Sequence, residues 1–174
     1  MADQPDGIVL ARHRDLKGRG WHPWVRRGLV SVVALVAVLA LFGFLGQSTS
    51  TTRAATSAAT LSVDAPDGVR GGLLYQARFT ILAHQELKRA TLVLNEKWID
   101  GLTVNTIEPS PVNEASRDGK LAFDLGHLAA GARYVLYVDY QVNPTTVGSR
   151  TLKAELDDGE QPVASLSRQL RIWP

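Results

Sequence analysis

The pattern of hydrophobic and polar positions divides the chain into one uniformly apolar stretch and one long alternating stretch. Residues 28–46 form a run of nineteen uncharged side chains, in which only Ser31 is polar. At about 1.5 Å per residue, a helix of this length spans about 28 Å, close to the hydrocarbon thickness of a bilayer. Because its apolar positions leave no polar face, the pattern predicts one transmembrane α-helix over 28–46.

Residues 60–174 change to a period of two, which is typical of strands with one buried face and one exposed face. Proline, glycine and aspartate separate the alternating runs at intervals of about 8–15 residues. The pattern predicts an all-β fold, an antiparallel immunoglobulin-like β-sandwich of about eight strands. The apolar positions that mark these strands are Leu61, Val63 and Ala65; Tyr75, Ala77, Phe79, Ile81 and Ala83; Ala90, Leu92 and Leu94; Leu102 and Val104; Leu121, Phe123 and Leu125; Tyr134, Leu136, Val138, Tyr140 and Val142; Leu152, Ala154 and Leu156; Leu166, Leu170 and Ile172.

The stretch between the two patterns consists almost entirely of serine, threonine and alanine, with Gln47 and Arg53. It has no pattern that would build a core, so we expect a flexible stalk. The predicted organisation is a basic cytoplasmic tail over 1–27, the transmembrane helix over 28–46, the stalk over 47–59 and an extracytoplasmic β-sandwich over 60–174.

Charge gives the expected orientation of the predicted helix. Residues 1–27 contain six arginines and lysines and three aspartates, whereas the first charge after the apolar run is Arg53. The positive-inside rule therefore places the N-terminus in the cytoplasm and the C-terminal domain outside the cell membrane. Four residues are expected at the membrane interface, with the lipid bilayer as their partner: Trp21, Trp24, Arg26 and Arg27.

The same segregation of charge explains the isoelectric point of about 9.1. Residues 47–174 carry thirteen basic and fourteen acidic side chains, so the domain itself is nearly neutral. The basic tail is explained by membrane topology, and we expect no nucleic-acid partner.

A cleaved signal peptide is the alternative to an anchor, because it also combines a basic segment with an apolar one. The apolar run here is longer than the usual ~7–15 residues, and the alanine-rich cleavage candidates begin only at Ala54. A mature N-terminus between Ala54 and Thr60 would make the protein a secreted one.

Residues 119–142, with the sequence GKLAFDLGHLAAGARYVLYVDYQV, resemble the second half of bacterial immunoglobulin-like envelope domains. These domains include the conserved repeat domain and CARDB-like adhesion modules. The matching positions are Leu125, Gly126, Leu128 and Gly131, where a strand ending in Leu-Gly is followed by leucine, a glycine turn and a long alternating strand. The resemblance covers residues 60–174 loosely. It implies the sandwich fold and offers no catalytic residues.

Motifs of enzymes and cofactor sites are missing from the sequence. The chain has no cysteine, four histidines without metal-ligand spacing, and no GxSxG, P-loop or GxGxxG motif. Asp157, Asp158 and Glu160 could ligate calcium, but with Gly159 they also make an ordinary acidic hairpin turn. We therefore expect no enzyme activity, no catalytic residue, no cofactor and no metal site.

Exposed aromatic residues are the remaining indication of function. In the strand that contains Tyr134 and Tyr140, residues Val135 and Tyr137 have the opposite parity and are expected on the outer face. Together with Trp98 they form the candidate contact surface. The sequence thus favours a membrane-anchored envelope protein whose sandwich binds a protein partner, as an accessory subunit of a membrane complex. A cell-wall or glycan-binding module is the alternative.

Overall fold

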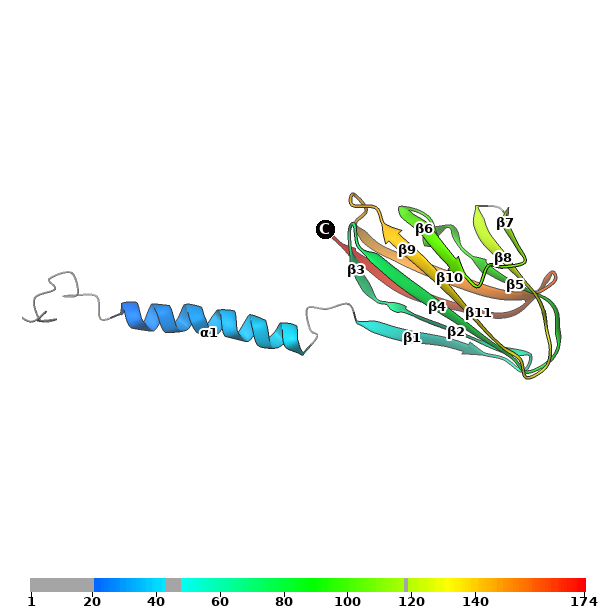
Figure 1. Cartoon of the computed structure of the whole chain (residues 1–174), viewed down its shortest axis with the longest axis horizontal. Coiled ribbons are helices and arrows are strands. Elements are labelled where there is room, and N and C mark those ends of the chain that lie inside the picture. The colour runs from blue at the N-terminus through cyan, green and yellow to red at the C-terminus, as the bar shows by residue number, and fades with distance from the viewer. Residues whose placement is uncertain (1–20, 43–47, 118) are drawn as a thin grey trace, which may run out of the picture. The chain divides into compact units, whose positions relative to one another are not determined.

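The computed structural model describes residues 21–42, 48–117 and 119–174, the side chain of residue 117 excepted. These residues belong to two compact units, Met1–Gly46 and Gln47–Pro174. The described residues of the first unit form a helix, and the second unit is a β domain with its own core (Figure 1).

Helix α1, His22–Leu41, is long and apolar enough to cross a membrane, and none of its residues is buried. It begins six residues before the predicted span because Pro23 stands in its first turn, where proline favours the start of a helix. Trp21 is its N-cap, and the Arg27 guanidinium lies 5.4 Å from the centre of the Trp24 ring. Of the expected tail over 1–27, residues 22–27 belong to α1 and residues 1–20 lie outside the described residues, as do the last four residues of the expected span.

Eleven strands in two sheets make up the described part of the β domain (Figure 1). The five-stranded sheet has the order β1-β2-β4-β9-β6, and the six-stranded sheet has the order β3-β11-β10-β5-β8-β7. Every sheet pairing is antiparallel except that of β3 with β11. The bounds are β1 Thr49–Ala55, β2 Ala59–Pro66, β3 Gly68–Arg70, β4 Leu74–Ala83, β5 Leu87–Leu94, β6 Leu102–Glu108, β7 Asn113–Arg117, β8 Lys120–Leu128, β9 Arg133–Val142, β10 Gly148–Asp158 and β11 Gln161–Trp173.

The predicted β-sandwich is confirmed, and each of the eight predicted strands is present. The sequence pattern missed β1, β3 and β7. Strand β3 is only three residues long, and the sequence of β7, NEASR, contains a single apolar side chain. Alternation of hydrophobic residues could not reveal either strand.

The expected flexible stalk over 47–59 is wrong, because most of it folds as β1. This strand pairs with β2 over its whole length, from Thr49 opposite Pro66 to Ala55 opposite Thr60. Its residues alternate between exposed and half-buried, but the half-buried ones are Ser50, Thr52 and Ala54. Small polar side chains therefore fill core-facing positions, and the period of two does not show in the hydrophobicity.

The buried arginine Arg168 connects β1 and β2 to the opposite sheet. Its side chain is 2% exposed and projects from β11 toward the end of β2. One of its terminal nitrogens donates hydrogen bonds to the carbonyl oxygens of Ala65 (2.6 Å) and Pro66 (3.2 Å). The same nitrogen lies 3.0 Å from Asp67 Oδ1 and 3.4 Å from the hydroxyl oxygen of Ser50. One guanidinium thus bonds β1, an edge strand of the five-stranded sheet, and its neighbour β2.

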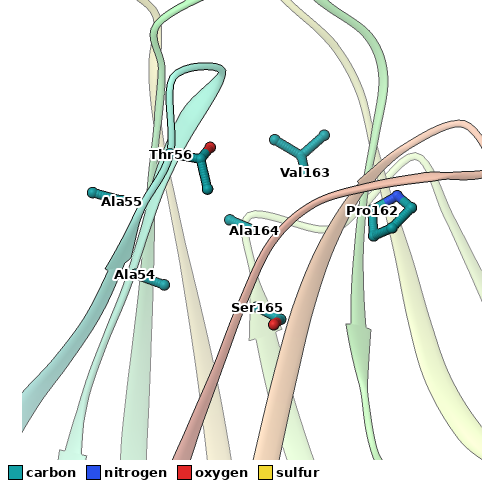
Figure 2. A pocket seen from close by; sticks show the side chains of 7 residues that line it. All are labelled: Ala54, Ala55, Thr56, Pro162, Val163, Ala164 and Ser165. Carbon is teal, nitrogen blue, oxygen red and sulfur yellow. The ribbon is translucent and has the colours of Figure 1, made fainter.

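A groove of about 380 Å³ lies between β1 and β11, at the end opposite to the start of β1. Here the end of β1 and its following turn approach the start of β11 (Figure 2). Its walls are short side chains from the two segments: Ala54, Ala55, Thr56, Pro162, Val163, Ala164 and Ser165. Small residues bring the two backbones close at this edge of the sandwich without filling the space between them.

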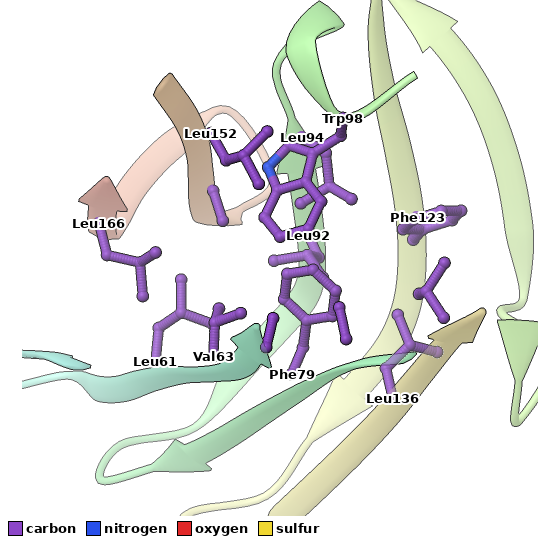
Figure 3. Close-up of a cluster of buried hydrophobic side chains, with 14 of the residues drawn as sticks. Leu61, Val63, Phe79, Leu92, Leu94, Trp98, Phe123, Leu136, Leu152 and Leu166 are labelled. Carbon is purple, nitrogen blue, oxygen red and sulfur yellow. The ribbon is translucent and has the colours of Figure 1, made fainter. Parts of the chain in front are cut away.

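The core lies between the two sheets and is centred on aromatic rings (Figure 3). Trp98, in the 3₁₀ turn Glu96–Trp98 after β5, is 0% exposed. Its ring centre lies 5.2 Å from that of Phe79 and 5.6 Å from that of Tyr140, and its indole N–H donates to the Lys153 carbonyl oxygen (3.0 Å). Burial with a satisfied N–H is the favoured arrangement for a core tryptophan. The expected place of Trp98 on a contact surface is therefore wrong.

We predict that a domain starting at residue 57 is less stable than one starting at residue 47. Removing β1 breaks its hydrogen bonds to β2, each with a net contribution of about 0.5–1.5 kcal/mol, and leaves Arg168 without Ser50. After the entropy regained by the freed residues is subtracted, the free energy of unfolding should fall by about 3 kcal/mol. Urea denaturation of the two domains, followed by circular dichroism, measures this difference. Equal stabilities would mean that β1 contributes no more than a stalk.

Candidate interaction surface

The outer face of the five-stranded sheet carries two of the three predicted contact residues. Tyr137 on β9 is 37% exposed, and Val135 on the same face is half-buried. Their neighbours of opposite parity, Tyr134 and Tyr140, face the core side, and Tyr140 is fully buried. The outward position of Val135 and Tyr137 therefore follows from the pleat of β9, as expected. Trp98 does not join them.

A continuous row of side chains crosses this face at the level of Tyr137. Successive sheet pairings place Glu108 opposite Tyr137, Tyr137 opposite Arg78, Arg78 opposite Asp64 and Asp64 opposite Thr51. Each of the five strands contributes one residue. We call these five residues the cross-sheet row. Side chains directly opposite each other on neighbouring strands are close enough to interact, so the row acts as one unit.

An ion pair fixes the middle of the cross-sheet row. Arg78 Nε and a terminal nitrogen of the same guanidinium lie 2.9 Å and 2.7 Å from Asp64 Oδ2, and the Thr51 hydroxyl donates to Asp64 Oδ1. Partial burial alone would raise the pKa of Asp64, but the hydrogen bonds from Thr51 and Arg78 and the positive charge of Arg78 lower it below its usual value. The hydrogen bond and the charge of Asp64 raise the pKa of Arg78 in turn, and the Tyr137 hydroxyl adds to this effect.

Apolar and polar side chains alternate around Tyr137 on this face. Gln76 donates to Asp139 Oδ1 (2.9 Å) in the row on one side, and Val135 stands opposite Thr80 in the row on the other side. The face therefore has a partly apolar centre, surrounded by polar groups that are fixed by hydrogen bonds to one another. This composition is common at interfaces between proteins that are also stable on their own in water.

The sequence pattern does not indicate that Asp64 and Arg78 lie in one row with Tyr137. Both residues occupy the polar parity of their strands, which marks them as outward-facing and no more. Their meeting depends on the register of three strands, and alternation within one strand does not contain this information.

The two histidines of the β domain and the acidic β10–β11 turn form contacts with nearby residues. His84 Nε2 lies 2.8 Å from the Thr60 hydroxyl, and His127 Nε2 lies 2.9 Å from a carboxylate oxygen of Glu86. Asp158 accepts a hydrogen bond from the backbone N–H of Arg89 (2.8 Å), so it holds the β10–β11 turn against β5. Within residues 21–42, 48–117 and 119–174, no three histidine, cysteine, aspartate or glutamate side chains are grouped as a metal site would require.

No family model matches the sequence, and no curated protein matches it. Among solved structures, the chain is similar to the CARDB domain of the PF1109 protein from Pyrococcus furiosus, which was crystallised with di-metal ions. The identity is 12% and the TM-score 0.43, over 72% of this chain and 89% of that domain. The chain is also similar to the human F-spondin reeler domain, with 16% identity and a TM-score of 0.42, over 70% of this chain and 92% of that one. The expected resemblance to CARDB-like modules is thus confirmed as a loose match of fold.

We predict that the stability contributed by the Asp64–Arg78 pair depends on pH. Because folding lowers the pKa of Asp64, the contribution is complete above the unfolded value of about 3.9 and is lost as pH falls through the lower folded value. Asp64→Asn should slightly destabilise the domain at pH 7, and the difference from wild type should shrink as pH falls below about 4. Thermal unfolding at pH 7 and pH 3 measures both effects. Asp139→Asn, on the same face, is the control. A difference at pH 7 that persists unchanged at pH 3 would contradict the pairing.

Proposed function

We propose that this chain is a single-pass membrane protein of the cell envelope, whose extracytoplasmic β-sandwich binds another envelope protein. The observation that carries the anchoring is α1, a twenty-residue helix without a buried position, whose residues from Gly28 onward are apolar all round except Ser31. A helix of this kind has no core of its own to face, and lipid is the environment that suits it.

The charges before and within the start of α1 support the proposed orientation. Arg26 and Arg27 lie in the second turn of the helix, and Trp21 and Trp24 lie beside them, where the indole rings suit the headgroup layer. Four more basic residues precede them in the sequence, and none follows the apolar run before Arg53. This arrangement favours a cytoplasmic N-terminus and an extracytoplasmic sandwich.

The outer face of the five-stranded sheet supports a role in binding rather than catalysis. It presents the exposed Tyr137, the half-buried Val135 and a set of ion-paired and hydrogen-bonded side chains. The carboxylates of Asp64 and Asp139 each accept hydrogen bonds from fixed side chains on the same face. No histidine stands in the cross-sheet row. A face of this composition can bind another surface by shape and hydrogen bonding, with Tyr137 as its natural anchor.

We expect the N-terminal helix to remain attached in the mature protein. Cleavage between Ala54 and Thr60 would remove part or all of β1 and its turn, and with it the edge of the five-stranded sheet. The protein should therefore stay in the membrane fraction after alkaline carbonate extraction and retain residues before Trp21. Deletion of residues 22–41 should release it. A mature N-terminus after residue 46 would contradict the anchor.

We expect a photo-crosslinking residue at position 137 to capture a protein partner in intact cells. The matched control is position 169 on β11, because Gln169 is also exposed but lies on the outer face of the other sheet. A discrete protein adduct at 137 and none at 169, identified by mass spectrometry, is the expected result. Equal adducts at both positions would contradict a specific face. Retention of the domain on isolated wall material without a protein adduct would favour glycan binding instead.

A further inference from the structure

One end of the sandwich, which we call the basal end, is where the domain begins and where β11 finishes. The backbone N–H of Asp67 donates to the carbonyl oxygen of Ser48 (3.1 Å), which places the start of β1 beside the β2–β3 turn. The N–H of Gly71 donates to the Trp173 carbonyl oxygen (2.9 Å), and that of Gly72 donates to the Val142 carbonyl oxygen (2.9 Å). Figure 1 shows β3 and the C-terminus together at this end.

The basal end carries most of the large exposed apolar side chains of the described β domain. Eight such side chains are exposed between residues 48 and 174, and five of them belong to this end. The most exposed of these five are Leu74 (61%), Val147 (58%) and Trp173 (49%). The five residues are Leu73, Leu74, Ile99, Val147 and Trp173. Exposed apolar side chains gathered at one place indicate a contact, whereas scattered ones do not.

Positive charge accompanies these apolar side chains. Arg70 and Arg171 are exposed, and neither has an ion pair with a carboxylate among the described residues. The guanidinium of Arg171 lies 5.1 Å from the centre of the Trp173 ring. By contrast, the nearby Asp67 is paired with the buried Arg168. Arg70 and Arg171 are therefore two positive charges at the basal end that no described carboxylate neutralises through an ion pair.

The length of the connection to α1 limits how far the basal end can be from the end of the helix. Helix α1 ends at Leu41, with Phe42 as its cap, and described structure resumes at Ser48. Six peptide units separate Phe42 from Ser48, and even fully extended they span at most about 20 Å. If α1 crosses a bilayer, residue 48 is held within this distance of the outer end of the helix.

We propose that the basal end of the sandwich docks on the outer headgroup layer of the bilayer that α1 spans. The proposal rests on the membrane anchoring proposed above. Tryptophan is favoured at the boundary between headgroups and hydrocarbon, leucine and valine bury their surface in the upper acyl chains, and arginine binds lipid phosphates. Leu74, Val147 and Trp173 would enter the interface, with Arg70 and Arg171 against the phosphates.

The chain contains no cysteine, so a single introduced thiol can be labelled specifically. The test uses the full chain in vesicles of phosphatidylcholine and phosphatidylglycerol, labelled with the environment-sensitive fluorophore NBD at Val147→Cys. The matched control is Glu160→Cys in the β10–β11 turn. The two positions flank β10, whose eleven residues at about 3.3 Å each span roughly 36 Å. A second control, Leu35→Cys, lies in the middle of α1.

The expected result is a blue-shifted NBD emission at position 147 that is quenched by doxyl-labelled lipid, with water-like and unquenched emission at position 160. Replacing Arg70 and Arg171 by glutamine should weaken the quenching at 147 when phosphatidylglycerol is present. Circular dichroism of each variant checks that the sandwich has folded.

Three outcomes would overturn the proposal, and they differ from failure of the anchor. Quenching at position 35 with water-like emission at 147 would show that α1 is anchored and the basal end stands free. A blue shift at 147 without lipid quenching would show that protein covers this end. Equal quenching at 147 and 160 would show no preferred end. Absence of quenching at position 35 would instead contradict the anchoring itself.

Discussion

The buried guanidinium of Arg168 is the interaction on which the shape of this domain most depends. It leaves β11 in one sheet and bonds the carbonyl oxygens at the end of β2 in the other. A buried cation needs hydrogen bonds to offset the loss of its hydration. Here one terminal nitrogen bonds the backbone oxygens of Ala65 and Pro66 and the carboxylate of Asp67, while the buried Nε of the same guanidinium has no hydrogen-bond partner among the described residues. These bonds hold the β2–β3 turn and the start of β1 in one place. The first strand of the domain and its last strand are thereby fixed together.

The two faces of the five-stranded sheet differ in character, and the outer face depends on the edge strand β1 that Arg168 bonds. Toward the interior, the sheet packs its aromatic residues around Trp98, and burial raises the pKa of Tyr75 and Tyr140 so that both stay neutral. Toward the exterior, the same strands present the cross-sheet row, whose outermost member Thr51 belongs to β1. Without β1, Asp64 would lose one of its two side-chain partners. The arrangement of the candidate surface thus depends on a strand of the edge that Arg168 holds.

The sequence predicted the elements whose burial is carried by large apolar side chains. In β4 and β9 every second residue is buried, and the alternation is plain. It failed for β1, whose core-facing residues are serine, threonine and alanine. It misplaced Trp98, because a single 3₁₀ turn has no periodicity to show which way one side chain points. It placed Val135 and Tyr137 correctly on the outer face but could not bring Arg78 and Asp64 to them, since register arises from the packing of the whole sheet.

The direction in which β1 runs has a mechanical consequence. It starts at the basal end, where the chain comes from α1, and continues along the edge of the sheet, paired with β2 residue by residue. A pull between the anchor and a partner held on the sheet face would act along the axis of β1. All of its interstrand bonds would then be strained together in shear, instead of opening one after another from a free end. A strand without a single large hydrophobic side chain is therefore the one through which tension would pass.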